Sequence, residues 1–399
     1  MVNFACIFSG AIAATSLISS VAAHPGETHD HAKIKREIDV RTLRASAAKR
    51  SLGACENSFK HRSLMERSMN RRAAALNKLR QKRGISVSST NTLRDSKKYR
   101  RDLAELQEFE TIDHNMTGID NYTPNTLASD IFVANTSCIL APEVTDGPYY
   151  VTGELIRQKV KEDQVGIDLY LEVQYVDVTT CDPVTGLYID IWNCNATGVY
   201  SGVESGQGGL NSTFLRGVQE SDEDGVVAFE TIFPGHYEGR AVHTHLLTKT
   251  NVTVRSNGTT GSDGAVTHIG QLFWPEDLIS AVEATEPYAS NTVAYTSNDE
   301  DMWSIVQADA EYDPFPQFVY LGEDITDGLM AWIQIGINAT ADYTDGDYYN
   351  VAATYQAGGG VANADSGFTG GAGGNGTMNG TMPSGAAPSG ATPSESTSA

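Results

Sequence analysis

Short stretches in which apolar and polar residues alternate recur along the middle of the chain, and they restrict it to a mainly β fold. In residues 168–178, Leu169, Leu171 and Val173 alternate with polar neighbours, which predicts a strand with one apolar and one polar face. Further strands are expected at residues 187–192, 225–232, 243–247 and 271–274. Turns rich in Gly, Pro and Asp separate these segments, so the sequence predicts an antiparallel β-sandwich.

Charge is distributed unevenly over the 399 residues. Of the 28 Lys and Arg, 21 lie at or before Arg101 beside 7 acidic residues, whereas the remainder carries 7 basic and 43 acidic residues. A single compact domain rarely separates charge in this way. We therefore expect separate roles for a basic extension at residues 24–105 and an acidic β-sandwich domain at residues 106–356. Within the extension, residues 63–83 are rich in strong helix formers and predict a helix.

Both ends of the chain differ from its body. Residues 1–23 contain a short apolar stretch that ends in small residues, which is typical of a secretory signal peptide. Ten N-x-[ST] glycosylation motifs agree with export. No second apolar run approaches the roughly 18 residues that a bilayer crossing needs. Residues 357–399 are rich in Gly, Ser, Thr and Pro and predict a disordered tail. We expect a secreted, extracellular protein that is not attached to a membrane.

Two features of the extension leave alternatives open. Its dibasic sites, at residues 35–36, 49–50, 82–83 and 100–101, are typical of a propeptide that is trimmed during export, but an ordinary helical extension fits equally well. Nucleic acid is not an expected partner of a secreted protein with such a charge run. After loss of Cys6 with the signal peptide, Cys55, Cys138, Cys181 and Cys194 allow three disulfide pairings, and the sequence does not choose among them.

Two tyrosines and two histidines in the middle of the chain offer a set of metal ligands. His243 and His245 are two residues apart, so a strand would direct both side chains to one face of its sheet. Tyr200 and Tyr237 lie in the nearby segments WNCNATGVYSG and FPGHYEGRAVHTHL. Tyrosinate is a hard oxygen donor that favours Fe(III), whereas neutral imidazole suits iron, copper and zinc alike. A copper or zinc protein that uses the same residues is a weaker alternative.

The motifs around these residues resemble those of the intradiol ring-cleavage dioxygenases. P-G-x-Y followed by R-x-x-H-x-H reads here from Pro234 to His245, and W-x-x-x-x-x-G-x-Y runs from Trp192 to Tyr200. Residues 146–150, DGPYY, resemble the stretch that lines the substrate side of the family's site, and HIGQLFW places Gln271 at the family's glutamine. All four segments occur in the family's order over residues 138–275.

The resemblance implies a fold, a cofactor and a reaction. The family's core is a β-sandwich, and its site holds Fe(III), here through Tyr200, Tyr237, His243 and His245. Two phenolates and a hydroxide neutralise the ferric ion, and a catechol then reacts with O2 to give a cis,cis-muconate-type diacid. By resemblance, the catalytic residues are Arg240, Tyr237 and Gln271, and the substrate contacts come from Tyr149, Tyr150 and Arg240. Because strand alternation alone would turn Arg240 away from the histidines, this role requires a bend between Gly239 and Val242.

One different class of function remains open. The same sandwich can serve as a non-catalytic, secreted cell-surface or carbohydrate-binding protein that retains the motif by descent. Retention of all four ligands argues against it, because a binding module gains nothing from two iron-bound phenolates. The expected partners are therefore a catechol-type small molecule and O2. The sequence does not specify which catechol is used or the oligomeric state.

Overall fold

The computed structural model describes residues 58–85, 104–118, 132, 139–140, 144–204, 208–307, 313–346, 349–356 and 359–363. The predicted signal peptide, most dibasic sites and nearly all of the predicted tail lie outside these residues. Within them, no helix combines the length and the apolar composition that a membrane crossing requires.

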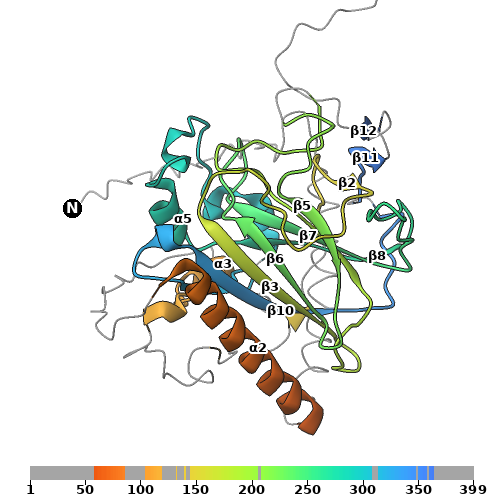
Figure 1. The fold of residues 1–399 in the computed structure, drawn as a ribbon, viewed down its shortest axis with the longest axis horizontal. Coiled ribbons are helices and arrows are strands. Elements are labelled where there is room, and N and C mark those ends of the chain that lie inside the picture. The colour runs from red at the N-terminus through yellow and green to blue at the C-terminus, as the bar shows by residue number, and fades with distance from the viewer. Residues whose placement is uncertain are drawn as a thin grey trace, which may run out of the picture.

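Two β-sheets pack face to face and form the body of the molecule, which confirms the predicted mainly β fold (Figure 1). The five-stranded sheet has the order β1-β10-β3-β6, and β9 pairs with β10. Its strands are β1 (Ile139–Leu140), β3 (Asp168–Asp177), β6 (Val226–Ile232), β9 (Gln317–Tyr320) and β10 (Leu329–Ile337). The four-stranded sheet has the order β5-β4-β7-β8. Its strands are β4 (Tyr188–Trp192), β5 (Arg216–Glu220), β7 (His243–Thr250) and β8 (Ala265–Phe273).

The pairings are antiparallel throughout the four-stranded sheet, whereas β10 runs parallel to β3 and β1. Alternate apolar side chains of both sheets meet in one core, to which β3 contributes Leu169, Leu171 and Val173 and β4 contributes Ile189 and Ile191. The expected apolar face of residues 168–178 is therefore the face that fills the core.

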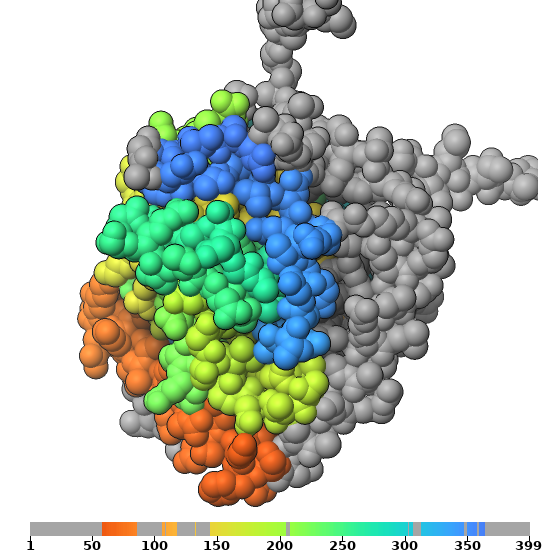
Figure 2. Space-filling view, turned by 90° about the vertical axis from the view of Figure 1, so that its right-hand side faces the viewer, coloured from red at the N-terminus to blue at the C-terminus, as the bar shows by residue number. Residues whose placement is uncertain are grey.

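A third, smaller sheet covers part of the four-stranded sheet on the side away from the core. It consists of β2 (Val151–Thr152), β11 (Ala353–Gln356) and β12 (Gly359–Ala362), in the order β12-β11-β2. The chain between β10 and β11 reaches it along β8, where the Tyr343 amide donates to the carbonyl oxygen of Val266 over 2.7 Å. Figure 2 shows this segment in blue beside the green residues of the β7–β8 region.

Short helices complete the described fold. These are α3 (Ala104–Glu110), α5 (Glu276–Glu283) and α6 (Met302–Gln307), with 3-10 turns at Met116–Gly118, Tyr288–Ser290, Asn298–Glu300 and Ile325–Asp327. Leu106 of α3 and Trp303 of α6 pack with Phe273 at the end of β8, in a small core beside β7 and β8.

The predicted N-terminal helix is present as α2 (Phe59–Arg83), four residues longer than expected at its start. Ser58 caps its first turn by accepting a hydrogen bond from the amide of His61, and Gly84 ends it in the left-handed conformation, with φ 67°. Leu76 and Leu79 pack against the outer face of the five-stranded sheet. The basic extension therefore contributes a buried layer to the acidic body, although the charge separation predicted distinct roles for the two.

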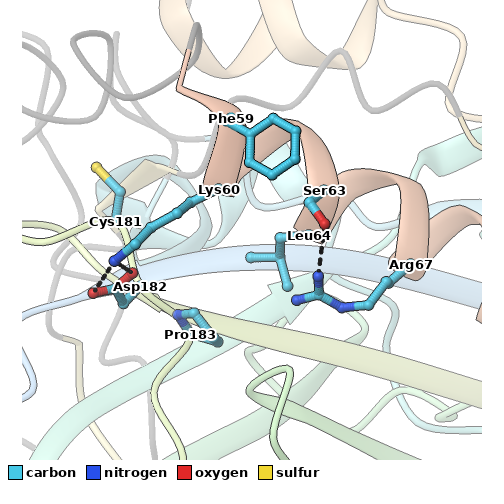
Figure 3. A pocket seen from close by; sticks show the side chains of 8 residues that line it. All are labelled: Phe59, Lys60, Ser63, Leu64, Arg67, Cys181, Asp182 and Pro183. Carbon is cyan, nitrogen blue, oxygen red and sulfur yellow. Dashed lines mark hydrogen bonds and ion pairs between the residues drawn. The ribbon is translucent and has the colours of Figure 1, made fainter.

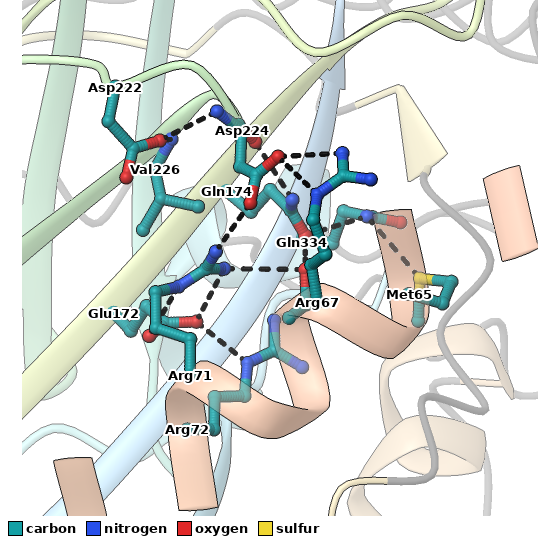
Figure 4. Close-up of polar contacts among 11 residues, drawn as sticks. Met65, Arg67, Arg71, Arg72, Glu172, Gln174, Asp222, Asp224, Val226 and Gln334 are labelled. Atoms are coloured by element: carbon teal, nitrogen blue, oxygen red, sulfur yellow. Dashed lines mark hydrogen bonds and ion pairs between the residues drawn. The ribbon is translucent and has the colours of Figure 1, made fainter. Parts of the chain in front are cut away.

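The polar face of β3 is buried as a consequence. Glu172 and Gln174 alternate with the core residues of β3 on its predicted polar face, and both have no exposed surface because α2 covers them. Arg72 of α2, 1% exposed, donates through Nε to Glu172 over 2.8 Å, and Ser68 donates to Gln174 over 3.0 Å. Figure 4 shows the contact of Arg72 with Glu172 and the ion pairs that Arg67 and Arg71 make to Asp224.

A shallow pocket lies between the first turns of α2 and residues 181–183 (Figure 3). Lys60 bridges it by an ion pair of 3.1 Å to Asp182, which is exposed at both ends. Cys181, on its wall, is disulfide-bonded, whereas Cys194 is a buried free thiol. The three pairings that the sequence left open all used Cys194, and the structure does not pair it. The pocket lies on the α2 side of the molecule, away from the predicted site residues on the four-stranded sheet.

Candidate metal centre

The paired histidines lie at the start of β7, inside the four-stranded sheet. His243 and His245 flank Thr244, and the alternation of the strand sends both imidazoles to the same face, as predicted. Their Nε2 atoms are 2.9 Å apart, and both side chains are buried. Trp192 lies opposite His245 in the register of β4 and stacks parallel to its ring at a centroid distance of 4.6 Å. The plane of the His245 ring is therefore fixed by its packing on Trp192.

We call Tyr200, Tyr237, His243 and His245 together the cluster. Hydrogen bonding determines which nitrogen of His243 faces the cluster as an acceptor. Nδ1 lies 2.6 Å from the carbonyl oxygen of Ala241, which can only accept, so Nδ1 carries the proton. Nε2 then presents a lone pair, and it lies 2.9 Å from Nε2 of His245 and 3.4 Å from Oη of Tyr237. A carbonyl that fixes the tautomer of an imidazole in this way is the usual partner of a metal-binding histidine.

Two loops that cross each other carry the tyrosines. Tyr200 follows β4, and Tyr237 lies between β6 and β7. A Cβ at Gly198 or at Gly235 would lie 2.4 or 2.5 Å from a carbonyl oxygen of the other loop, which is too close for any side chain. Gly198 also has φ 83°, a conformation that favours glycine. The glycines of the two tyrosine motifs therefore permit the backbone contact that brings the phenols together.

The phenol rings of Tyr200 and Tyr237 meet edge to face at a centroid distance of 5.4 Å. Burial raises the pKa of both phenols well above the ordinary value, and the charge of the neighbouring phenol adds to this for Tyr200. A cation bound to the oxygens reverses this preference, because it stabilises the phenolates directly. Ionised tyrosines at this position thus require a positive charge in the cluster.

The predicted bend before the histidines is present and places Arg240 beside the cluster. The chain turns at residues 237–240, where Gly239 has φ 80°. The guanidinium of Arg240 is fully buried and donates through Nε to Asp301 over 2.8 Å and through Nη2 to Gln271 over 2.5 Å. Gln271 in turn donates to the carbonyl oxygen of Thr145 over 2.8 Å.

Arg240 remains a cation in this position. Burial lowers its pKa, but the charge of Asp301 and of the two phenols outweighs burial, so the pKa is raised overall. Its Nη1 is buried and has no hydrogen-bond partner among the described residues. Sequence reasoning missed Asp301, because it lies about 60 residues further along the chain and no motif surrounds it.

The two remaining predicted residues lie at different depths. The ring of Tyr149 stacks on Tyr200 at 4.5 Å and meets Tyr237 at 5.8 Å, and it is partly exposed. Tyr150 is buried and packs on Trp192 at 4.9 Å, so it contacts the tryptophan that supports His245 instead of the four-residue cluster. The structure thus brings Tyr149, and not Tyr150, against the phenols.

Tyr237, His243 and His245 place donor atoms close enough for one metal ion, and the ring of Tyr200 lies beside them. At metal–nitrogen distances of about 2.0–2.1 Å, two imidazoles on one ion stand at most about 4.2 Å apart, and the two Nε2 atoms at 2.9 Å meet this condition. Two phenol oxygens with two imidazoles form a hard donor set that suits a ferric ion. Elsewhere in the described part of the chain, no group of three or more His, Cys, Asp or Glu residues could hold a metal.

Comparison with known proteins agrees with the motifs. A family model described as Dioxygenase matches residues 145–254. An intradiol ring-cleavage dioxygenase from Tetranychus urticae is 30% identical, with 51% of this chain and 97% of that chain covered and a TM-score of 0.43. The dioxygenase domain of a dioxygenase carbohydrate-binding protein fusion from Streptomyces sp. SirexAA-E is 20% identical, with 49% and 97% covered and a TM-score of 0.33.

Catechol 1,2-dioxygenase from Acinetobacter sp. ADP1 is 16% identical, with 49% of this chain and 62% of that chain covered and a TM-score of 0.34. Among curated proteins, no relative matches the chain. The family-model match and the 30% identity along nearly the whole Tetranychus urticae dioxygenase agree with the four motifs. The chain belongs to the intradiol ring-cleavage dioxygenases.

Proposed function

We propose that this protein is a secreted, Fe(III)-dependent intradiol dioxygenase that opens catechol-type rings between the two hydroxylated carbons. Both atoms of one O2 enter the product, so catechol gives a cis,cis-muconate-type diacid without an external reductant. The observation that carries the proposal is the convergence at Nε2 of His243, which lies 3.4 Å from Tyr237 Oη and 2.9 Å from Nε2 of His245. Together with Tyr200, these residues would hold the iron.

The iron supplies a Lewis acid and one-electron acceptor for a bound catechol. The protein's own residues supply the proton transfer and the charge. The Tyr237 hydroxyl is the group beside the histidines that can exchange a proton with a bound substrate. As a phenolate, its Oη, 3.4 Å from Nε2 of His243, would take a proton from a catechol hydroxyl.

Arg240 and Tyr149 act on the substrate in this proposal. The buried guanidinium of Arg240 stabilises negative charge that builds on the ring, since it is held rigidly by Asp301 and Gln271 and needs no reorganisation. Tyr149 is partly exposed, and its ring lies over Tyr200, so it forms one wall for a planar aromatic ring.

Export is part of the proposal and rests on the sequence of residues 1–23, which lie outside the described part of the structure. The glycosylation motifs support it, because four of their asparagines lie exposed on the surface: Asn211, Asn251, Asn257 and Asn338. A glycan on any of them requires no change in the packing.

The test is product analysis with isotopically labelled oxygen. Iron-loaded protein is incubated with catechol under 18O2, and the products are separated by mass. A muconate-type diacid that carries two labelled atoms is expected, and the Tyr200→Phe/Tyr237→Phe double variant serves as the matched control. A fully iron-loaded protein that forms no ring-opened product would contradict the proposal and favour a non-catalytic binding protein on the same fold.

A further inference from the structure

A second arginine, Arg216, lies beside Tyr200. It is the first residue of β5, lies opposite Trp192 in the register with β4, and is 1% exposed. Its Nε donates to the carbonyl oxygen and to the hydroxyl of Ser201, both over 3.0 Å, and its Nη2 donates to the same carbonyl over 2.7 Å. Ser201 directly follows Tyr200. The guanidinium carbon also lies 6.0 Å from the centroid of the Tyr200 ring.

The charge of Arg216 is balanced inside the protein. Burial lowers its pKa, and the charge of Glu154 is the largest interaction that counteracts this. Glu154 is itself buried, and burial raises the pKa of its carboxyl group to about 7. A buried guanidinium is costly to build for packing alone, since apolar residues of similar volume are often as stable. The burial of Arg216 therefore indicates a role beyond stability.

Arg157 provides a natural comparison, because it holds the same stretch of backbone. Its guanidinium donates to the carbonyl oxygens of Thr213, at 2.6 Å, and Arg216, at 2.8 and 3.0 Å. Its remaining nitrogen pairs with Glu162 at the surface over 2.7 Å. Arg157 thus fixes the start of β5 without a described contact to Tyr200, whereas Arg216 holds the residue next to Tyr200 and lies against its ring.

We propose that Arg216 is a positioning residue for the metal-binding phenol of Tyr200, which it aims into the cluster by holding the Ser201 backbone and the face of the phenol ring. The inference rests on the proposed function, because it assigns Tyr200 to the iron. It predicts that Arg216 acts through Tyr200 alone. The planar guanidinium is required for this task, because its hydrogen bonds to Ser201 come from two nitrogens held in one plane. Lys supplies the charge from a single nitrogen and cannot reproduce this arrangement.

The test compares Arg216→Met, Arg216→Lys and Arg157→Met in the full chain. Each metal-depleted protein is titrated with ferric citrate, and the visible tyrosinate-to-iron band and the iron retained against a chelator are recorded. Tyr200→Phe and Tyr237→Phe give the reference spectra of each single-tyrosinate site. If Arg216→Met does not fold, Arg216→Met/Glu154→Gln replaces it, because that double variant also removes the buried carboxyl group whose charge interacts with Arg216.

In Arg216→Met we expect about 10- to 100-fold weaker iron binding, as is typical when a residue that orients a ligand is lost. Its band should move toward that of Tyr200→Phe, Arg216→Lys should lie between Arg216→Met and the wild type, and Arg157→Met should match the wild type. A wild-type band and affinity in Arg216→Met would overturn the inference, as would an equal change in Arg157→Met. A wild-type protein without any such band would instead refute the ferric site itself.

Discussion

Removal of the buried charge of Arg72 should show that helix α2 is a structural part of the dioxygenase domain. Its Nε lies 2.8 Å from Glu172, and the two side chains are 1% and 0% exposed. Arg72→Met leaves Glu172 buried with only Arg71, a partner at 3.3 Å that is one quarter exposed. Loss of one partner of a buried ion pair typically costs about 3–5 kcal/mol. At about 2–4 °C per kcal/mol for a domain of this size, the Tm should fall by about 6–20 °C.

The assay is thermal and urea unfolding of the wild type, Arg72→Met and the Arg72→Met/Glu172→Met double variant. We expect the double variant to recover most of the loss, because it removes both charges from the interior and keeps the volume. Lys60→Met is the matched surface control, since its ion pair with Asp182 is exposed and should contribute under about 1 kcal/mol. A change of less than about 1 kcal/mol in Arg72→Met would refute the packing of α2 on the sheet (Figure 4).

Three further predictions concern the site and its surroundings. Tyr237→Phe removes one proposed metal-binding oxygen and the proposed proton acceptor, so the visible tyrosinate-to-iron band should lose intensity and catechol cleavage should fall. Unchanged turnover in steady-state kinetics would contradict the role of Oη. Arg240→Lys keeps the positive charge but loses the planar guanidinium that Asp301 and Gln271 hold, and we expect catechol turnover to fall about 10²- to 10³-fold at unchanged iron content. A loss of turnover below about tenfold would contradict the proposed role of Arg240. Burial raises the pKa of Glu154 to about 7, so the folded state binds a proton that the unfolded state has released, and the free energy of unfolding falls as pH rises from about 4.5 to 7. Relative to Glu154→Gln, the wild type should lose on the order of 3 kcal/mol over that range in urea unfolding; parallel pH profiles would exclude the shift.

The strands could be predicted because their cause is local. The apolar residues of β3 recur with period two, and the glycines and prolines between segments mark turns. The gathering of His243 and His245 follows from the same period. The approach of Tyr200 to Tyr237 does not follow from any period, and only the resemblance to a known family placed them in one site.

Features that depend on distant parts of the chain could not be predicted. Glu172 and Gln174 have the spacing of a solvated face, and nothing near them in sequence indicates that α2, about 100 residues earlier, covers them. Asp301 and Arg216 are single charged residues outside the motifs, and their contacts with Arg240 and Ser201 arise only when the sheet assembles. The cysteine count left the disulfide pairing open, and only the structure identifies Cys194 as a free thiol, enclosed beside the carbonyl oxygen of Gly235 at 3.0 Å.

The most direct test of the ferric site is the visible absorption spectrum of the purified protein, recorded before and after addition of catechol without oxygen. We expect a red-brown tyrosinate-to-iron band that moves to longer wavelength when catechol binds and that disappears when the iron is removed by a chelator. An iron-loaded protein that remains colourless would show that Tyr200 and Tyr237 do not bind the metal, and it would contradict the proposed chemistry.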